Sequence, residues 1–162
     1  MAIDTTHPRG APAEGVLRTR RTVVVGFDGS EESRAALRSA LERVRAGDTV
    51  QVVHAYAEVS SWIGDPFYGQ EVTEAQGEAR RVLELAESIA RYTPAEVTYE
   101  LHEGAPAGVL ARIAALREAD EIVVGTRGLG RIRAALGSVS QELVRTADRP
   151  VLVVPAAKGR AA

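Results

Sequence analysis

The sequence contains no cysteine and only one lysine, Lys158, among its 20 basic residues. Without cysteine the chain cannot form disulfides, thiolate zinc sites or a cysteine nucleophile. This composition fits a reducing compartment, and we expect a cytoplasmic protein. The phosphate loop of P-loop hydrolases ends in Gly-Lys-Ser/Thr, so a lone lysine near the C-terminus also excludes that motif.

Long apolar runs and a strong net charge are also missing. No apolar run approaches the roughly 20 residues that a membrane helix needs, so we expect no membrane partner. The formal net charge is −2. It provides no general attraction to nucleic acid or to anionic lipid, so nucleic acid is not an expected partner either.

The 162 residues are enough for one domain that buries roughly 70% of its unfolded surface. Residues 1–20 carry two prolines, two glycines and scattered charge without hydrophobic periodicity, which predicts a disordered N-terminal arm. We expect one folded domain over residues 21–156 and a frayed C-terminal tail over residues 157–162.

Strand-like and helix-like segments alternate along the folded part of the chain. This alternation predicts an α/β fold with one doubly wound, Rossmann-like parallel sheet and helices on both faces. We expect five strands in the order 3-2-1-4-5. The predicted strands are residues 22–28, 49–55, 96–101, 122–124 and 151–154, and the predicted helices follow Ser30 or span 71–91, 106–118 and 139–147.

Two segments depart from the regular pattern. Residues 96–101 alternate apolar and polar side chains, which is typical of a strand with one solvated face, so we place them at a sheet edge. Residues 56–70 contain the only tryptophan, three other aromatics and turn residues. We expect a flexible excursion or lid there, whose aromatic side chains either pack as local core or shield a bound base.

A glycine-rich stretch connects the fourth predicted strand to the last helix. It begins Gly125-Thr-Arg-Gly128 and ends Gly137-Ser138. Glycines let backbone N–H groups approach phosphate oxygens, and a helix N-terminus adds partial positive charge. The structural alternative is that Ser138 and Gln141 form a capping box and the glycines serve a tight turn. The spacing also differs from the dinucleotide-binding fingerprint.

Residues 21–155 resemble the universal stress protein family. The resemblance is carried by VVVGFDGSEES at 23–33, VVHAY at 52–56 and GTRGLGRIRAALGSVSQELVRTADRPVLVVP at 125–155. The ATP-binding branch of that family has a Gly-x2-Gly-x9-Gly-Ser/Thr signature. Both ends of this signature are present here, with eight residues, 129–136, in place of nine.

The resemblance implies a sheet of the adenine nucleotide α-hydrolase-like kind. It also implies binding of ATP, or of AMP or cyclic AMP, with Mg²⁺ accompanying ATP. It also implies a homodimer that pairs through the last strand, Val151–Val154, whose exposed apolar edge invites such pairing. The residues that the resemblance places at the nucleotide are Gly26, Phe27, Asp28, Ala55, Val124, Gly125, Arg127, Gly128, Gly137, Ser138, Val139 and Ser140.

Several of these assignments have simpler structural explanations. Asp28 is also a typical turn or helix-start residue, Ala55 a typical core residue, and His54 a typical structural histidine. We expect a nucleotide-binding stress-response protein that acts through partner interactions. No general base is evident, so any ATP hydrolysis or phosphoryl transfer would be slow. A module that binds no nucleotide is the remaining alternative.

Overall fold

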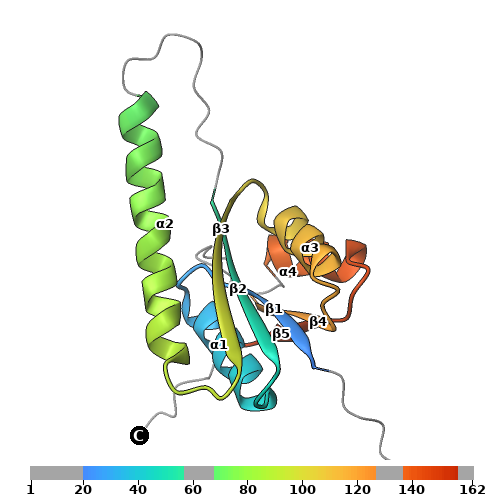
Figure 1. Cartoon of the computed structure of the whole chain (residues 1–162). Coiled ribbons are helices and arrows are strands. Elements are labelled where there is room, and N and C mark those ends of the chain that lie inside the picture. The colour runs from blue at the N-terminus through green and yellow to red at the C-terminus, as the bar shows by residue number, and fades with distance from the viewer. Residues whose placement is uncertain (1–19, 57–67, 127–136, 157–162) are drawn as a thin grey trace, which may run out of the picture.

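The computed structural model describes residues 20–56, 68–126 and 137–156, and these form alternating strands and helices (Figure 1). The predicted N-terminal arm, the C-terminal tail, most of the expected excursion and most of the glycine loop lie outside the described residues. In chain order the elements are β1 (Thr22–Gly26), α1 (Glu31–Arg43), β2 (Thr49–Tyr56), α2 (Tyr68–Ala90), β3 (Glu96–Glu103), α3 (Pro106–Leu116), β4 (Glu121–Gly125), α4 (Ser138–Thr146) and β5 (Val151–Val154).

The five strands form one parallel sheet in the order β3-β2-β1-β4-β5, which confirms the predicted fold. The central pair is β1 and β4, where Val25 lies opposite Val123. The connection from β1 leads outward to β2, whereas the connection from β4 leads outward to β5 on the other side. The strand order therefore reverses between β1 and β4.

The helices cover both faces of the sheet (Figure 1). Helices α1 and α2 pack on one face, where Leu37 and Leu83 meet Val23 and Val25 of β1. Helices α3 and α4 pack on the opposite face, and their core includes Leu143. Because alternate side chains of a strand point to opposite faces, the continuous valines of β1 supply both cores.

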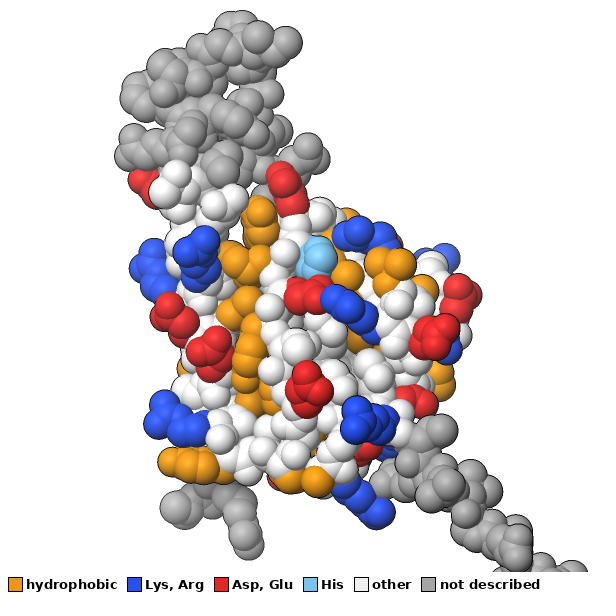
Figure 2. Space-filling view, in the orientation of Figure 1, with side chains coloured by type: hydrophobic (Ala, Val, Ile, Leu, Met, Phe, Trp, Pro, Cys, Tyr) orange, Lys and Arg blue, Asp and Glu red, His pale blue; other side chains and the backbone are white. Residues whose placement is uncertain are grey.

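Both edge strands are only partly covered. Every residue of β3 is half-buried or exposed, as its alternating sequence predicts for an edge. Hydrophobic side chains form a band on this face of the molecule (Figure 2). Val97, Tyr99 and Leu101 of β3 are partly buried and pack against the α1/α2 core. At the other edge, all four residues of β5 are half-buried. No helix in the described part of the chain is long and apolar enough to cross a membrane.

Several boundaries differ from the sequence prediction. Tyr56 still belongs to β2 and Tyr68 already begins α2, so the irregular segment is shorter than residues 56–70 at both ends. Ser30 caps α1 as expected, because its side chain accepts a hydrogen bond from the N–H of Ser33. Helix α4 begins at Ser138, which makes Gly137 the N-cap residue.

Candidate functional site

The C-terminal ends of β1 and β4 meet where the strand order reverses. In open α/β sheets ligands bind in the crevice beyond such strand ends, because the connections there diverge to opposite faces. In this chain the corresponding position is flanked by the segment after Gly26, by Gly125 and by the start of α4. These are the segments in which the sequence predicted nucleotide-contacting residues.

Gly26 ends β1 under tight packing from the α3 face. A Cβ atom added at this position would lie 2.8 Å from Cδ1 of Leu110 and 3.0 Å from Cγ1 of Val124. Both neighbouring side chains are buried, at 3% and 4% exposure. The absence of a side chain at Gly26 therefore lets α3 and β4 approach the end of β1 closely.

Asp28 organises the turn between β1 and α1. Its Oδ1 atom accepts hydrogen bonds from the backbone N–H of Ser30 at 3.0 Å and from the Ser30 hydroxyl at 2.6 Å. Gly29 turns the chain with a φ of +80°, a conformation that favours glycine. The structural alternative for Asp28 is thus confirmed as one of its roles. Within the described residues, Oδ2 of the half-buried carboxylate has no protein partner and is available to a ligand.

Phe27 is an interior residue whose backbone borders the crevice. Its side chain is 2% exposed and belongs to the α1/α2 core. Its N–H donates to the carbonyl of Val53 at 2.9 Å, and its own carbonyl accepts from Nδ1 of His54 at 2.8 Å. A contact of Phe27 with a ligand would therefore have to come from the backbone of this segment.

Ala55 and Val124 lie on the α3/α4 side of the sheet. Val124 is a buried member of that core, and Ala55 is half-buried and packs against it. Gly125 ends β4 opposite Val154 of β5. The structural alternative for Ala55 is in keeping with this packing, and its half-exposed position also leaves room for contact with a ligand.

The N-terminus of α4 has no side-chain cap. Gly137 is the N-cap residue, and the first intrahelical bond runs from the N–H of Gln141 to the Gly137 carbonyl at 2.9 Å. The predicted capping box is therefore wrong, because Ser138 lies one residue inside the helix. Within the described residues the backbone N–H groups of Ser138, Val139 and Ser140 have no partner. The positive end of the helix dipole is consequently open.

The hydroxyl groups of Ser138 and Ser140, in the first turn of α4, differ in exposure and in hydrogen bonding. Ser138 is exposed, whereas Ser140 is 2% exposed and its hydroxyl lies 3.0 Å from the carbonyl oxygens of both Thr126 and Gly137. The Gly137 N–H also donates to the Thr126 carbonyl, at 2.6 Å. These bonds join the two ends of the glycine loop. The Ser140 hydroxyl is therefore occupied by main-chain oxygens, and its backbone N–H is the group left to meet a phosphate.

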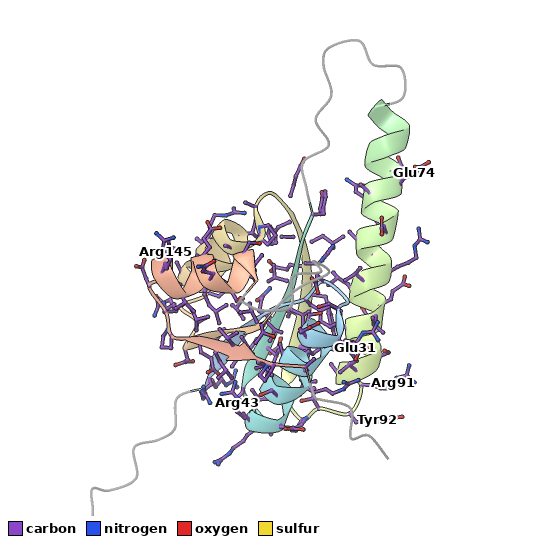
Figure 3. The ribbon with its side chains drawn as sticks, turned by 180° about the vertical axis from the view of Figure 1, so that it is seen from behind. Glu31, Arg43, Glu74, Arg91, Tyr92 and Arg145 are labelled. Atoms are coloured by element: carbon purple, nitrogen blue, oxygen red, sulfur yellow. The ribbon has the colours of Figure 1, made fainter. Side chains whose placement is uncertain are left out.

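Val139 is half-buried and packs against the α3/α4 core, so it fixes the first turn of α4 to the domain. Arg127 and Gly128 lie outside the described residues. Arg145 projects from the last turn of α4, at the end opposite Gly137 (Figure 3). A basic residue at that position stabilises the negative end of the helix dipole.

Sequence reasoning missed the contribution of Thr126. Its carbonyl receives the bonds that join the ends of the glycine loop, and its N–H donates to the Val154 carbonyl at 2.9 Å. All of these bonds involve the Thr126 backbone, so the side-chain type at position 126 does not predict them. The bond from His54 to Phe27 was missed for a related reason, because it depends on the register between β1 and β2.

Other polar groups lie outside this crevice. Glu31, labelled in Figure 3 at the start of α1, pairs with Arg34 at 3.1 Å. Asp28 also lines an open hollow between the β1–α1 turn and α2, together with Arg34 and Arg81 among others. Among residues 20–56, 68–126 and 137–156, no group of three histidine or carboxylate side chains is placed to hold a metal ion.

The fold is a doubly wound α/β domain with its candidate site at the strand reversal. A sequence model of the universal stress protein family matches residues 19–155. The chain therefore belongs to the universal stress protein family, as the sequence resemblance predicted. A universal stress protein from Thermus aquaticus is 35% identical over 136 residues, which cover 83% of this chain and 98% of the relative.

Solved structures with the same fold include members of this family. UspA from Lactobacillus plantarum superposes with a TM-score of 0.72 over 85% of this chain and 99% of its own, and its 21% identity supports the fold alone. A universal stress protein from Archaeoglobus fulgidus in complex with dAMP is 27% identical, with a TM-score of 0.63 over 84% and 98% of the two chains. Another, in complex with cAMP, is 27% identical, with a TM-score of 0.56 over 86% and 99%.

Proposed function

We propose that this protein binds an adenine nucleotide, with ATP as the first candidate, in the crevice beyond β1 and β4. In this proposal it is a cytoplasmic stress-response protein that acts through a homodimer and partner interactions. The proposal is supported by membership of the family and by the relatives that are complexed with dAMP and cAMP, each 27% identical to this chain.

The observation that carries the proposal is the uncapped start of α4. Three consecutive N–H groups, from Ser138 to Ser140, have no partner within the described residues. Helix N-termini are usually capped by a side-chain oxygen, and an open one next to a glycine loop is suited to phosphate oxygens. Asp28 follows the neighbouring strand, and its Oδ2 atom could accept hydrogen bonds from ribose hydroxyls.

The binding experiment is a calorimetric titration of the purified protein with ATP, AMP and cAMP, with and without Mg²⁺. It is combined with identification of any nucleotide that co-purifies. We expect saturable binding of at least one adenine nucleotide, and the order of affinities decides between ATP and a monophosphate. Release of ADP or phosphate over hours would reveal slow hydrolysis. If none of the three nucleotides binds, the proposal is wrong.

A substitution at the N-cap separates binding from folding. The φ of −63° and ψ of 160° at Gly137 are accessible to any residue. Gly137→Asp would cap α4 and improve stability by a few tenths of a kcal/mol. Its carboxylate would also occupy the open N–H groups and repel phosphate, so we expect affinity to fall by about tenfold or more. Gly137→Ala is the matched control without a cap and should retain binding.

Two substitutions distinguish the turn-forming role of Asp28 from a role in nucleotide binding. Asp28→Asn keeps an oxygen for the two bonds from Ser30 but removes the charge, whereas Asp28→Ala removes both. If Asp28 contacts the ribose, Asp28→Asn should weaken nucleotide binding while leaving the unfolding midpoint nearly unchanged. If Asp28→Asn binds normally and only Asp28→Ala loses stability, the residue serves the turn alone.

The homodimer is tested at β5. The Pro150 carbonyl accepts a bond from Ile122 of β4, and the Val154 carbonyl accepts one from Thr126, which follows β4. The alternate residues Val151 and Val153 therefore direct their backbone groups to the open edge. Val153→Pro removes one N–H from that edge, and Val153→Thr is the isosteric control that keeps it. In sedimentation velocity we expect a dimer for the natural chain and for Val153→Thr, and monomer for Val153→Pro. A monomeric natural chain would refute the dimer.

A further inference from the structure

The segment that leaves β1 is attached to β2 by a side chain. Backbone pairing between the two strands runs from Thr22 opposite Thr49 to Gly26 opposite Val53. One residue further, the Phe27 N–H donates to the Val53 carbonyl, and the Phe27 carbonyl receives a bond from His54 Nδ1 at 2.8 Å. A carbonyl oxygen can only accept, so Nδ1 carries the proton and the neutral ring is the Nδ1–H tautomer.

We propose that His54 is a positioning residue for the nucleotide site, acting through the Phe27–Asp28 peptide. This inference rests on the proposed function. The ring of Phe27 is buried, its N–H is bonded to the Val53 carbonyl, and its carbonyl is bonded to His54. The next residue is Asp28, whose Oδ1 accepts both bonds from Ser30 and whose Oδ2 is the oxygen that the proposed function assigns to the nucleotide. The bond from His54 thus fixes the peptide group that precedes Asp28, and with it the position from which the carboxylate extends.

The geometry separates His54 from the ligand itself. On β2, Val50 and Val52 belong to the α1/α2 core, whereas Val53 and Ala55 belong to the α3/α4 side. By this alternation the side chain of His54 leaves the strand on the α1/α2 side, opposite Ala55. The ring therefore acts on the far side of the strand from the residue that the family resemblance places next to the base.

A purely structural histidine would give a different pattern of effects. Loss of a structural bond lowers stability and leaves the affinity of the folded protein unchanged. A positioning residue changes affinity because the freed Phe27 carbonyl lets the turn sample other directions, and the ligand must then select the competent one. The two roles are therefore distinguished by affinity measured well below the unfolding transition.

The test compares two substitutions at His54. His54→Asn retains an N–H donor at a position similar to Nδ1, whereas His54→Leu has comparable bulk and no donor. AMP and ATP are titrated calorimetrically into the natural chain and both variants at a temperature where each is folded by circular dichroism. We expect His54→Leu to weaken binding by roughly tenfold and His54→Asn to recover most of that loss.

Amide hydrogen exchange provides a readout that does not require the ligand. In His54→Leu, exchange at Asp28, Gly29 and Ser30 should become faster relative to the core strands, and His54→Asn should remain close to the natural chain. In the natural chain, nitrogen-15 spectra should show the Nδ1–H tautomer. This last measurement needs no variant, so it applies even if His54→Leu fails to fold.

The outcomes distinguish this inference from the proposed function. If the natural chain binds no adenine nucleotide, the proposed function fails and the inference with it. If the natural chain binds but His54→Leu binds equally tightly, only the inference is overturned. An Nε2–H tautomer in the natural chain, or equal loss of affinity in His54→Asn and His54→Leu, would also overturn it.

Discussion

Replacing Gly26 by alanine tests whether the end of β1 is as tightly packed as its surroundings indicate. The added Cβ would lie 2.8 Å from Leu110 Cδ1 and 3.0 Å from Val124 Cγ1. Ordinary carbon–carbon contacts are about 3.5–4.0 Å, so these side chains must retreat by roughly 0.5–1.2 Å. Both belong to the α3/α4 core and have little free space around them.

The expected loss follows from two opposing effects. Overpacking a buried site by one methyl group costs about 1–3 kcal/mol. Replacing glycine also restricts the unfolded chain, which returns about 0.4–1 kcal/mol. We therefore expect Gly26→Ala to lower the free energy of unfolding by about 1–2 kcal/mol. The midpoint of thermal unfolding should fall by about 2–4 °C for each kcal/mol lost.

The assay is urea unfolding followed by circular dichroism, with Gly108→Ala as the matched control. Gly108 lies in α3 and a Cβ there would meet nothing within 4 Å. The same substitution at Gly108 should therefore stabilise the protein by about half a kcal/mol. The Leu110→Ala substitution removes the closest side chain. In that background, Gly26→Ala should reduce the free energy of unfolding by about 1 kcal/mol less than it does in the natural chain. Equal effects at both glycines, or no coupling to Leu110, would refute the packing argument.

Three further predictions concern stability. Glu118 follows α3 with a φ of 49°, so Glu118→Gly should raise the urea midpoint by relieving about 0.5–1 kcal/mol of strain, whereas no gain is expected from Glu118→Ala. Leu143 is fully buried, and Leu143→Ala should cost about 2–5 kcal/mol; a loss below 1 kcal/mol would show that α4 is held by other contacts. Burial raises the pKa of Glu100, but bonds from His102 and Arg117 outweigh it, so the pKa lies below its usual value. A lowered carboxyl pKa adds stability that is present above the ordinary value of about 4.3 and is lost as pH falls through the lowered value. The loss of urea stability between neutral and acidic pH should therefore be smaller in Glu100→Gln, and an unchanged pH profile would contradict this.

The open helix end and the site at the strand reversal belong together physically. Glycine at position 137 leaves the first turn of α4 without a capping oxygen, and the bonds to Thr126 keep that turn next to the end of β4. Glycine at the N-cap costs a few tenths of a kcal/mol relative to a capping side chain. A bound anion would recover this loss, so nucleotide binding and the stability of α4 are expected to be coupled.

The sequence by itself determined the architecture. Apolar runs such as Val23–Val25 and Val151–Val154 require burial or pairing, and the amphipathic segments between the strands specify helices that cover a parallel sheet. Local chemistry also predicted the Ser30 cap and the edge position of β3. These features follow from residues near one another in the chain, where side-chain period and propensity decide.

Only the tertiary structure decided how the site residues are used. It made Gly137 rather than Ser138 the helix cap, turned the Ser140 hydroxyl inward to main-chain oxygens, and joined His54 to Phe27. Each of these depends on backbone groups of segments brought together by the sheet. Backbone N–H and carbonyl groups are the same in every residue except proline, so their pairing across the fold leaves no pattern in the sequence.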